Sequence, residues 1–205
     1  KNELKKWLRA MRQEAVKTNK EWAGRLGINI STAITAVKPS GTVSQLVDSA
    51  TGIHPRYSAQ YIRRVRADAR DPLCTVLEAA GVPVEDDVMS ASTKVFSFPI
   101  ASPDGAVTAS EMGAMEQLEL WEIYQDEWCE HKPSMTCYYR DEEFLEVGQW
   151  LYNKFDKVSG ISFLPYSDHT YQQAPYEPVD KKTYNQLVKD FPKEISWDIE
   201  EASDM

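Results

Sequence analysis

Residues 34–44 read Ile-Thr-Ala-Val-Lys-Pro-Ser-Gly-Thr-Val-Ser, and this stretch says the most about the fold of the chain. It predicts a short β-branched strand, a tight turn and the start of a helix. Pro39 fixes its own φ and favours an extended backbone at the residue before it. Gly41 lets the chain turn sharply and lets a ligand come close to the backbone. The stretch therefore predicts a strand-to-helix turn with accessible backbone groups.

Such a turn is a candidate phosphate-binding site. Ser40 and Thr42 can cap the helix that follows, and the free N–H groups at a helix start carry partial positive charge. Lys38 either adds charge to the site or points into solvent. Many strand-to-helix turns of this kind bind nothing, so the pattern alone leaves a purely structural turn open.

The composition of the whole chain is that of a globular protein. Its 205 residues suffice for a domain with its own core, and 42% of them are hydrophobic. The net charge of −9 argues against a general nucleic-acid surface but leaves room for one local phosphate pocket. No apolar run approaches the roughly 20 residues that span a bilayer, and the first residues do not resemble a signal peptide. We expect no membrane and no direct nucleic acid binding.

The cysteines and histidines suggest no metal site. Three cysteines without paired or metal-like spacing fit free, packed or half-exposed thiols in a reducing cytosol, so we expect a cytoplasmic location. The three histidines are far apart and form no ligand pair. These residues are Cys74, Cys129 and Cys137, and His54, His131 and His169.

Helical and strand patterns alternate along the chain, which predicts an α/β arrangement rather than separate layers. An apolar stripe at helical spacing ends at Gly27, Asp71-Pro72 begins a helix, and Thr108 with Glu111 has capping-box spacing. Expected helices cover 3–26, 43–46, 71–81, 108–130, 141–160 and 181–190; expected strands cover 34–37, 61–67, 95–100, 135–139 and 161–164; residues 171–178 read as irregular.

Several ordered motifs carry a resemblance to a known family. They read KPSGTVS at 38–44, TGIHP at 51–55, YIRRVR at 61–66, WCEHKPS at 128–134, FLEVG at 144–148, ISFLPY at 161–166 and QQAPY at 172–176. Together they resemble the adenosylcobalamin-dependent (class II) ribonucleotide reductases of the ribonucleoside-triphosphate type. The resemblance runs from about residue 4 to residue 199.

The resemblance implies a sharper fold than the periodicity does. The family is built on a ten-stranded α/β barrel, and this chain resembles the C-terminal part of the catalytic chain. Residues 1–170 would be the C-terminal part of the barrel domain, and 171–205 a partly irregular extension. The chain also lacks an initiator Met, so we expect either a piece of a longer polypeptide or a processed one.

The resemblance also implies a function. The family converts ribonucleoside triphosphates to deoxyribonucleotides by thiyl-radical chemistry, with adenosylcobalamin as cofactor and thioredoxin or a similar dithiol as reductant. Substrate phosphate binding would fall on Ser40, Gly41, Thr42 and Val43. The family's radical-bearing cysteine motif and its C-terminal cysteine pair are absent here. We therefore name no catalytic residue, expect the chain alone to be inactive, and expect the remainder of the reductase chain as a partner.

Some interpretations stay open at this point. Five arginines either pair with carboxylates on a solvated strand face or contact nucleotide phosphate or cobalamin, and His54 either fixes a turn or lies at the mouth of the active site. The cobalamin-contacting residues are unknown. The chain as a whole could instead be a split-reductase subunit, or a non-catalytic nucleotide-binding or interaction module derived from a reductase. The arginines are Arg56, Arg63, Arg64, Arg66 and Arg70.

Overall fold

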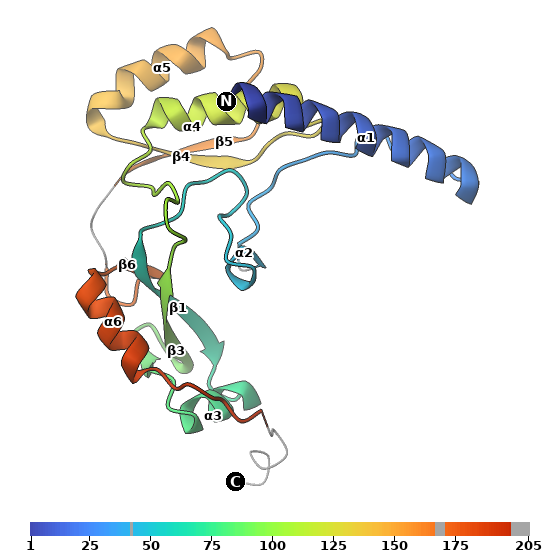
Figure 1. Cartoon of the computed structure of the whole chain (residues 1–205). Coiled ribbons are helices and arrows are strands. Elements are labelled where there is room, and N and C mark those ends of the chain that lie inside the picture. Colours follow the sequence, from blue (N-terminus) through green and yellow to red (C-terminus); the bar gives the residue numbers. More distant parts are fainter. Residues whose placement is uncertain (42, 167–170, 198–205) are drawn as a thin grey trace. The chain divides into compact units, whose positions relative to one another are not determined.

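The fold is described by a computed structural model that covers residues 1–41, 43–166 and 171–197. The chain divides into two compact units, each built from two separate stretches of sequence. The first unit takes Lys1–Arg56 and Val107–Ser167, and the second takes Tyr57–Ala106 and Asp168–Met205. Figure 1 labels their helices and strands.

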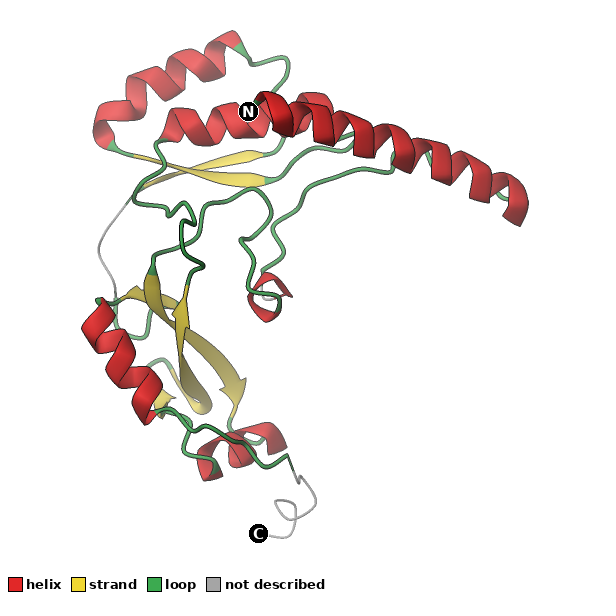
Figure 2. Cartoon of the chain, viewed as in Figure 1, coloured by secondary structure: helices red, strands yellow, loops and turns green. Residues whose placement is uncertain are grey.

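The first unit is built around a parallel pair of strands. Strand β4 (Met135–Tyr139) runs parallel to β5 (Ile161–Pro165), and the connection between them contains α5 (Phe144–Asn153). This is the crossover that a parallel pair requires. Helix α4 (Ala114–Glu127) packs on β4, and Figure 2 shows α4 and α5 on the same side of the pair. The core between them contains Ala114, Leu118, Trp121, Met135, Cys137 and Val147.

Helix α1 (Asn2–Leu26) packs against α4 and leaves most of its apolar stripe exposed. Gly27 ends the helix in the left-handed conformation, with φ of 66°, as the sequence predicted. Leu8 and Ala23 are buried, but Trp7 is 60% exposed and Trp22 51%. The predicted helix is therefore confirmed, but only part of its apolar stripe is buried.

The second unit is built around an antiparallel sheet in the order β2-β3-β1-β6. Its strands are β1 (Gln60–Asp68), β2 (Val84–Asp87), β3 (Ser90–Ala101) and β6 (Tyr176–Pro178). Helix α3 (Pro72–Ala79) begins at Asp71, whose carboxylate accepts the N–H of Leu73 at 2.9 Å. Helix α6 (Lys181–Asp190) has the bounds that the sequence predicted. A second core contains Cys74, Leu77, Val82 and Phe96.

The structure corrects the predicted start of α4. Glu111 does accept from both the N–H and the hydroxyl of Thr108, at 3.0 and 2.7 Å, but this closes a turn and opens no helix. The helix begins six residues later, at Ala114, whose N–H donates to the Glu143 carboxylate at 2.8 Å. A capping carboxylate from outside the helix thus sets the start.

Other predicted elements differ in smaller ways. The predicted helix 141–160 is a 3₁₀ turn, η1 (Asp141–Glu143), followed by the shorter α5, and residues 34–37 are extended without forming a strand. Strands β2 and β6 were not predicted. The sheet of the second unit is antiparallel, so the alternating arrangement expected from the sequence holds only for the parallel pair in the first unit.

The expected mixture of helices and strands is confirmed, and the described residues contain no barrel. The boundary predicted after residue 170 stays a prediction. Within the described ranges, no helix combines the length and apolar character that crossing a bilayer requires.

Candidate functional site

The extended segment 34–37, which leads into the predicted phosphate turn, is held by the WCEHKPS segment. The carbonyl of Thr35 accepts the N–H groups of Glu130 and His131, at 3.0 and 3.1 Å, and the carbonyl of Val37 accepts the N–H of Ser134 at 3.0 Å. The Thr35 hydroxyl donates to the Trp128 carbonyl at 2.5 Å. Backbone hydrogen bonds therefore hold together two segments, 34–37 and 128–134, that lie about 90 residues apart in the sequence.

The carboxylate of Glu130 strengthens this attachment. It accepts the N–H of Ile34 at 2.7 Å and lies 3.4 Å from the N–H of Thr35. The Ile34 N–H is the largest cause that holds the pKa of Glu130 below its ordinary value; the Thr35 N–H and the charge of Arg12 act in the same direction, against partial desolvation. Glu130 is therefore a positioning residue for the segment that precedes the turn.

The TGIHP motif lies against the same segment. Gly52 has a φ of 57°, and a Cβ there would stand 2.9 Å from the Lys38 carbonyl oxygen. His54 accepts the Thr136 N–H on Nε2 at 3.0 Å, so its Nδ1 carries the proton and donates to the Thr51 carbonyl at 2.7 Å. This arrangement supports the turn-fixing interpretation of His54.

The predicted turn itself lies on the surface. Ser40, Gly41 and Val43 are exposed, and Gly41 adopts the left-handed conformation with φ of 57°. A Cβ on Gly41 would have no atom within 4 Å, so the space beside this glycine is open. The carbonyl of Ser40 accepts the Val43 N–H at 3.2 Å, which closes the turn. Among the described residues, the N–H groups of Ser40 and Gly41 have no hydrogen-bond partner.

The residues around the turn complete its description. The helix that follows is the four-residue α2 (Val43–Leu46). Ser44 is buried; its hydroxyl bonds the Gly41 carbonyl at 3.2 Å and the Thr51 hydroxyl at 3.0 Å. Lys38 donates from Nζ to the Lys132 carbonyl at 3.2 Å, so its ammonium group is directed to the backbone. Thr42, the remaining predicted phosphate ligand, lies outside the described residues.

The arginines of β1 bind the QQAPY segment of the second unit. Arg63, Arg64 and Arg66 donate to the carbonyls of Pro175, Ala174 and Gln173, at 3.1, 3.1 and 3.0 Å. Each also has a second interaction: Arg63 lies over the Tyr176 ring at 4.4 Å, Arg64 pairs with Glu177 at 2.6 Å, and Arg66 with Asp87 at 2.5 Å.

The remaining two arginines pair with carboxylates close to them in sequence. Arg56 is buried and contacts Asp48 at 2.8 Å, and Arg70 pairs with Asp68 at 3.1 Å. The structure therefore favours ion pairing for four of the arginines, whereas Arg63 contacts the Pro175 carbonyl and the Tyr176 ring. Carbonyl binding is a role that the sequence did not suggest.

None of the three thiols has the surroundings of a reactive cysteine. Cys74, Cys129 and Cys137 are all free and buried. Burial raises the pKa of each, to about 12 for Cys137, so the thiolate form is disfavoured. The described residues hold no cluster of three or more potential metal ligands.

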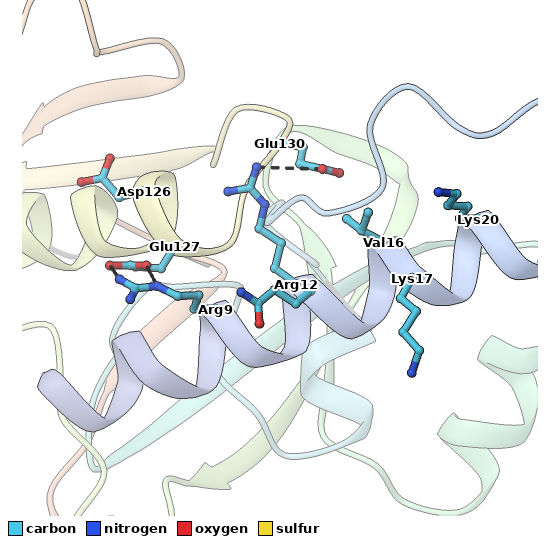
Figure 3. A pocket seen from close by; sticks show the side chains of 9 residues that line it. Arg9, Arg12, Val16, Lys17, Lys20, Asp126, Glu127 and Glu130 are labelled. Atoms are coloured by element: carbon cyan, nitrogen blue, oxygen red, sulfur yellow. Dashed lines mark hydrogen bonds and ion pairs between the residues drawn. The ribbon is translucent and has the colours of Figure 1, made fainter.

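A groove between α1 and the end of α4 is lined by four cations and three carboxylates (Figure 3). Arg9 makes a bidentate contact with Glu127 at 2.8 and 2.9 Å, and Arg12 lies 3.9 Å from Glu130. Lys17 pairs with Glu14 within α1. Because carboxylates pair with three of the four cations, Arg9, Arg12 and Lys17, we assign no anion site to the groove.

Comparison with known proteins identifies the relatives of this chain. No family model matches it. It is 32% identical over 191 residues to the adenosylcobalamin-dependent ribonucleoside-triphosphate reductase of Levilactobacillus brevis, covering 91% of this chain and 26% of that protein. The enzyme of the same name from Lactobacillus leichmannii is 34% identical over 191 residues, again 91% of this chain and 25% of the relative.

A solved structure agrees with these sequence matches. The crystal structure of a B12-dependent (class II) ribonucleotide reductase aligns with a TM-score of 0.85 and 30% identity, covering 98% of this chain and 28% of that one. The chain is thus homologous to one portion of the class II ribonucleotide reductases, and it spans about a quarter of the length of the curated relatives it matches.

Proposed function

We propose, because the chain is homologous to one portion of the class II ribonucleotide reductases, that it forms part of a reductase that converts ribonucleoside triphosphates to deoxyribonucleotides. Its own contribution would be the turn Ser40, Gly41, Thr42 and Val43, which binds the substrate phosphates. Residues 1–170 would belong to the reductase barrel, and 171–205 to a C-terminal extension.

The surface position of the turn is the observation that carries the proposal. Gly41 leaves open space beside a backbone bend, and the N–H groups of Ser40 and Gly41 have no partner among the described residues. Unpaired N–H groups in a bend are the usual means by which backbone binds phosphate oxygens. The WCEHKPS and TGIHP motifs fix the segment before the bend, which holds the N–H groups in place without covering them.

The radical chemistry would come from elsewhere in the complete enzyme. Adenosylcobalamin would supply the radical. The three thiols of this chain are buried, and the arginines of β1 have partners. A dithiol such as thioredoxin would supply the electrons. We therefore expect this chain by itself to reduce no ribonucleotide.

A chimeric enzyme tests the proposal. In the Lactobacillus leichmannii reductase, the 191 matched residues are replaced by their counterparts in this chain, and conversion of ribonucleoside triphosphate is measured with adenosylcobalamin and a dithiol. We expect deoxyribonucleotide from the chimera and none from the chain alone. A folded chimera without activity, or turnover by the isolated chain, would contradict the proposal.

A further inference from the structure

The four-residue helix α2 buries a polar residue and exposes apolar ones. Ser44 is 4% exposed, whereas Val43 is 61% and Leu46 85% exposed. Helices in globular proteins normally turn their apolar residues inward, and a helix of one turn is not stable by itself in water. Apolar packing of Val43 and Leu46 therefore does not hold α2 and the turn before it in place, and the buried hydroxyl of Ser44 is the next candidate.

The Ser44 hydroxyl is the middle member of a short chain of hydrogen bonds. It donates to the Gly41 carbonyl at 3.2 Å and lies 3.0 Å from the Thr51 hydroxyl. A serine hydroxyl has one proton to donate, so we assign Thr51 as the donor of the second bond. The bonds then run from Thr51 through Ser44 to Gly41, and hydrogen bonds in such a chain polarise and strengthen one another.

Thr51 is itself anchored on strand β4 through His54. The Thr51 carbonyl accepts the backbone N–H of His54 at 3.0 Å and its Nδ1–H at 2.7 Å. The other ring nitrogen of His54, Nε2, accepts the Thr136 N–H of β4 at 3.0 Å. A series of side-chain and backbone hydrogen bonds thus connects β4 with the Gly41 carbonyl.

The Gly41 carbonyl is the atom through which this chain of bonds acts on the turn. Gly41 adopts φ of 57°, but a glycine adopts many other conformations as readily, so the bend needs constraints from other residues. One is the turn bond between the Ser40 carbonyl and the Val43 N–H at 3.2 Å, and the Ser44 hydroxyl on the Gly41 carbonyl is another. Both use acceptors of the bend and leave its donors, the N–H groups of Ser40 and Gly41, for a ligand.

We propose that Ser44 and Thr51 are positioning residues for substrate phosphate: their hydroxyls hold the Gly41 bend in the conformation that presents the N–H groups of Ser40 and Gly41 to the phosphate oxygens. This inference rests on the proposed function, because the turn it concerns is the phosphate-binding turn of that proposal. Neither hydroxyl contacts the phosphate; both act through the Gly41 carbonyl. Without them the substrate must order the bend when it binds, which lowers affinity.

Matched substitutions at Thr51 in the chimeric reductase test the proposal. Thr51→Val keeps the branched shape of the side chain and removes the hydroxyl, whereas Thr51→Ser keeps the hydroxyl. We expect Thr51→Val to raise the KM for ribonucleoside triphosphate about two- to tenfold with kcat within about twofold, as the loss of one hydrogen bond implies. Thr51→Ser should stay within about twofold of the parent chimera in both parameters. Equal KM values for the two variants would overturn the inference.

A double-mutant cycle tests whether Thr51 acts through Ser44. Ser44→Ala alone should raise KM at least as much as Thr51→Val, because it removes the donor to the Gly41 carbonyl itself. Adding Thr51→Val to Ser44→Ala should then change KM by less than about twofold, since the two residues belong to one chain of bonds. Fully additive effects on KM would contradict the assigned chain.

A control variant separates positioning from a general loss of stability. Thr108→Val also removes a buried hydroxyl of the first unit, one that donates to Glu111 at 2.7 Å. It should lower the melting temperature of the chimera and leave KM unchanged. A KM raised as much by Thr108→Val as by Thr51→Val would assign the effect to lost stability and overturn the inference.

The full present chain gives a readout that does not depend on reductase activity. NMR relaxation measures the order parameter of a backbone amide. We expect the order parameter of the Gly41 amide to fall in Ser44→Ala and Thr51→Val but not in Thr51→Ser, while the Gly105 amide stays the same in all three. A Gly41 order parameter that no variant changes would overturn the inference.

The outcomes also distinguish this inference from the proposed function. A folded chimera without activity would refute the reductase role, and the Gly41 order parameter would then decide by itself whether the hydroxyls hold the bend. An active chimera whose KM is the same in every variant would overturn the inference and leave the proposed function intact.

Discussion

The two units of this chain use their sequence motifs in opposite ways. In the first, WCEHKPS and TGIHP fix the segment before the turn and leave the backbone of Ser40 and Gly41 accessible. In the second, the three arginines of YIRRVR bind the carbonyls of QQAPY, and two of them, Arg64 and Arg66, also pair with carboxylates. A neutral bend with accessible N–H groups can therefore be a better phosphate candidate than a cluster of cations, because these cations already have partners.

The core under the WCEHKPS segment gives the largest expected effect. Trp121 is fully buried, donates its indole N–H to the Pro133 carbonyl at 3.0 Å, and packs edge-on against Trp150. Trp121→Ala should lower the free energy of unfolding by about 3–5 kcal/mol. Trp7→Ala, at a 60% exposed position, should change it by less than about 0.5 kcal/mol. Urea denaturation checks both, and similar losses would refute this packing.

The contact between the TGIHP loop and the turn segment comes next. Gly52→Ala introduces a Cβ 2.9 Å from the Lys38 carbonyl oxygen in addition to left-handed strain, whereas Gly105→Ala, at φ of 77° with open space around it, introduces strain alone. We expect losses of about 3 kcal/mol and about 1 kcal/mol in the free energy of unfolding. Equal losses would show that the loop does not press on the turn segment.

Acid should weaken the attachment of the turn segment through Glu130. Its folded pKa lies below the ordinary value of 4.5, so its contribution to stability is complete above that value and is lost as pH falls through the folded pKa. Glu130→Gln should therefore be less stable than the wild type at pH 6, and the gap should narrow towards about pH 3. Urea midpoints across this range measure it. A gap independent of pH would contradict the role of the carboxylate, and Glu14→Gln, at an exposed helix position, serves as control.

The smallest expected effect is that of a substitution in the second unit on the KM for substrate. Arg66→Gln removes the contacts with Asp87 and with the Gln173 carbonyl, so the melting temperature of the chain should fall. The KM of the chimeric reductase for ribonucleoside triphosphate should stay within about twofold, since no contact with phosphate is lost. A KM raised several-fold with unchanged kcat would instead place this arginine at the substrate.

Local signals in the sequence predicted the elements whose ends are set locally. Asp71 before Pro72 and Gly27 after the first helix act through their own backbone and nearest neighbours, and both were predicted correctly. The predicted start of α4 was wrong because the first N–H of the helix donates to the carboxylate of Glu143, which lies 29 residues away in the sequence. Strand β2 was missed because its sequence, Val-Glu-Asp-Asp, lacks apolar alternation.

The candidate site likewise combines features that local sequence sets with features that distant residues set. The bend at Gly41 follows from proline and glycine chemistry, but the role of Glu130 depends on a partner 96 residues away that no local pattern reveals. The arginine cluster likewise looked cationic in the sequence, because its carbonyl partners come from the far end of the chain.

The most direct measurement is the triphosphate KM of the chimeric reductase carrying Gly41→Val. The variant should fold, because the valine side chain has open space around it, although it is strained at φ of 57°. The same side chain fills the space that a phosphate would enter. Gly105→Val, with φ of 77° and equally open surroundings, is the control. We expect a KM raised about tenfold or more for Gly41→Val and unchanged for the control. An unchanged KM for both would show that substrate phosphate is bound elsewhere.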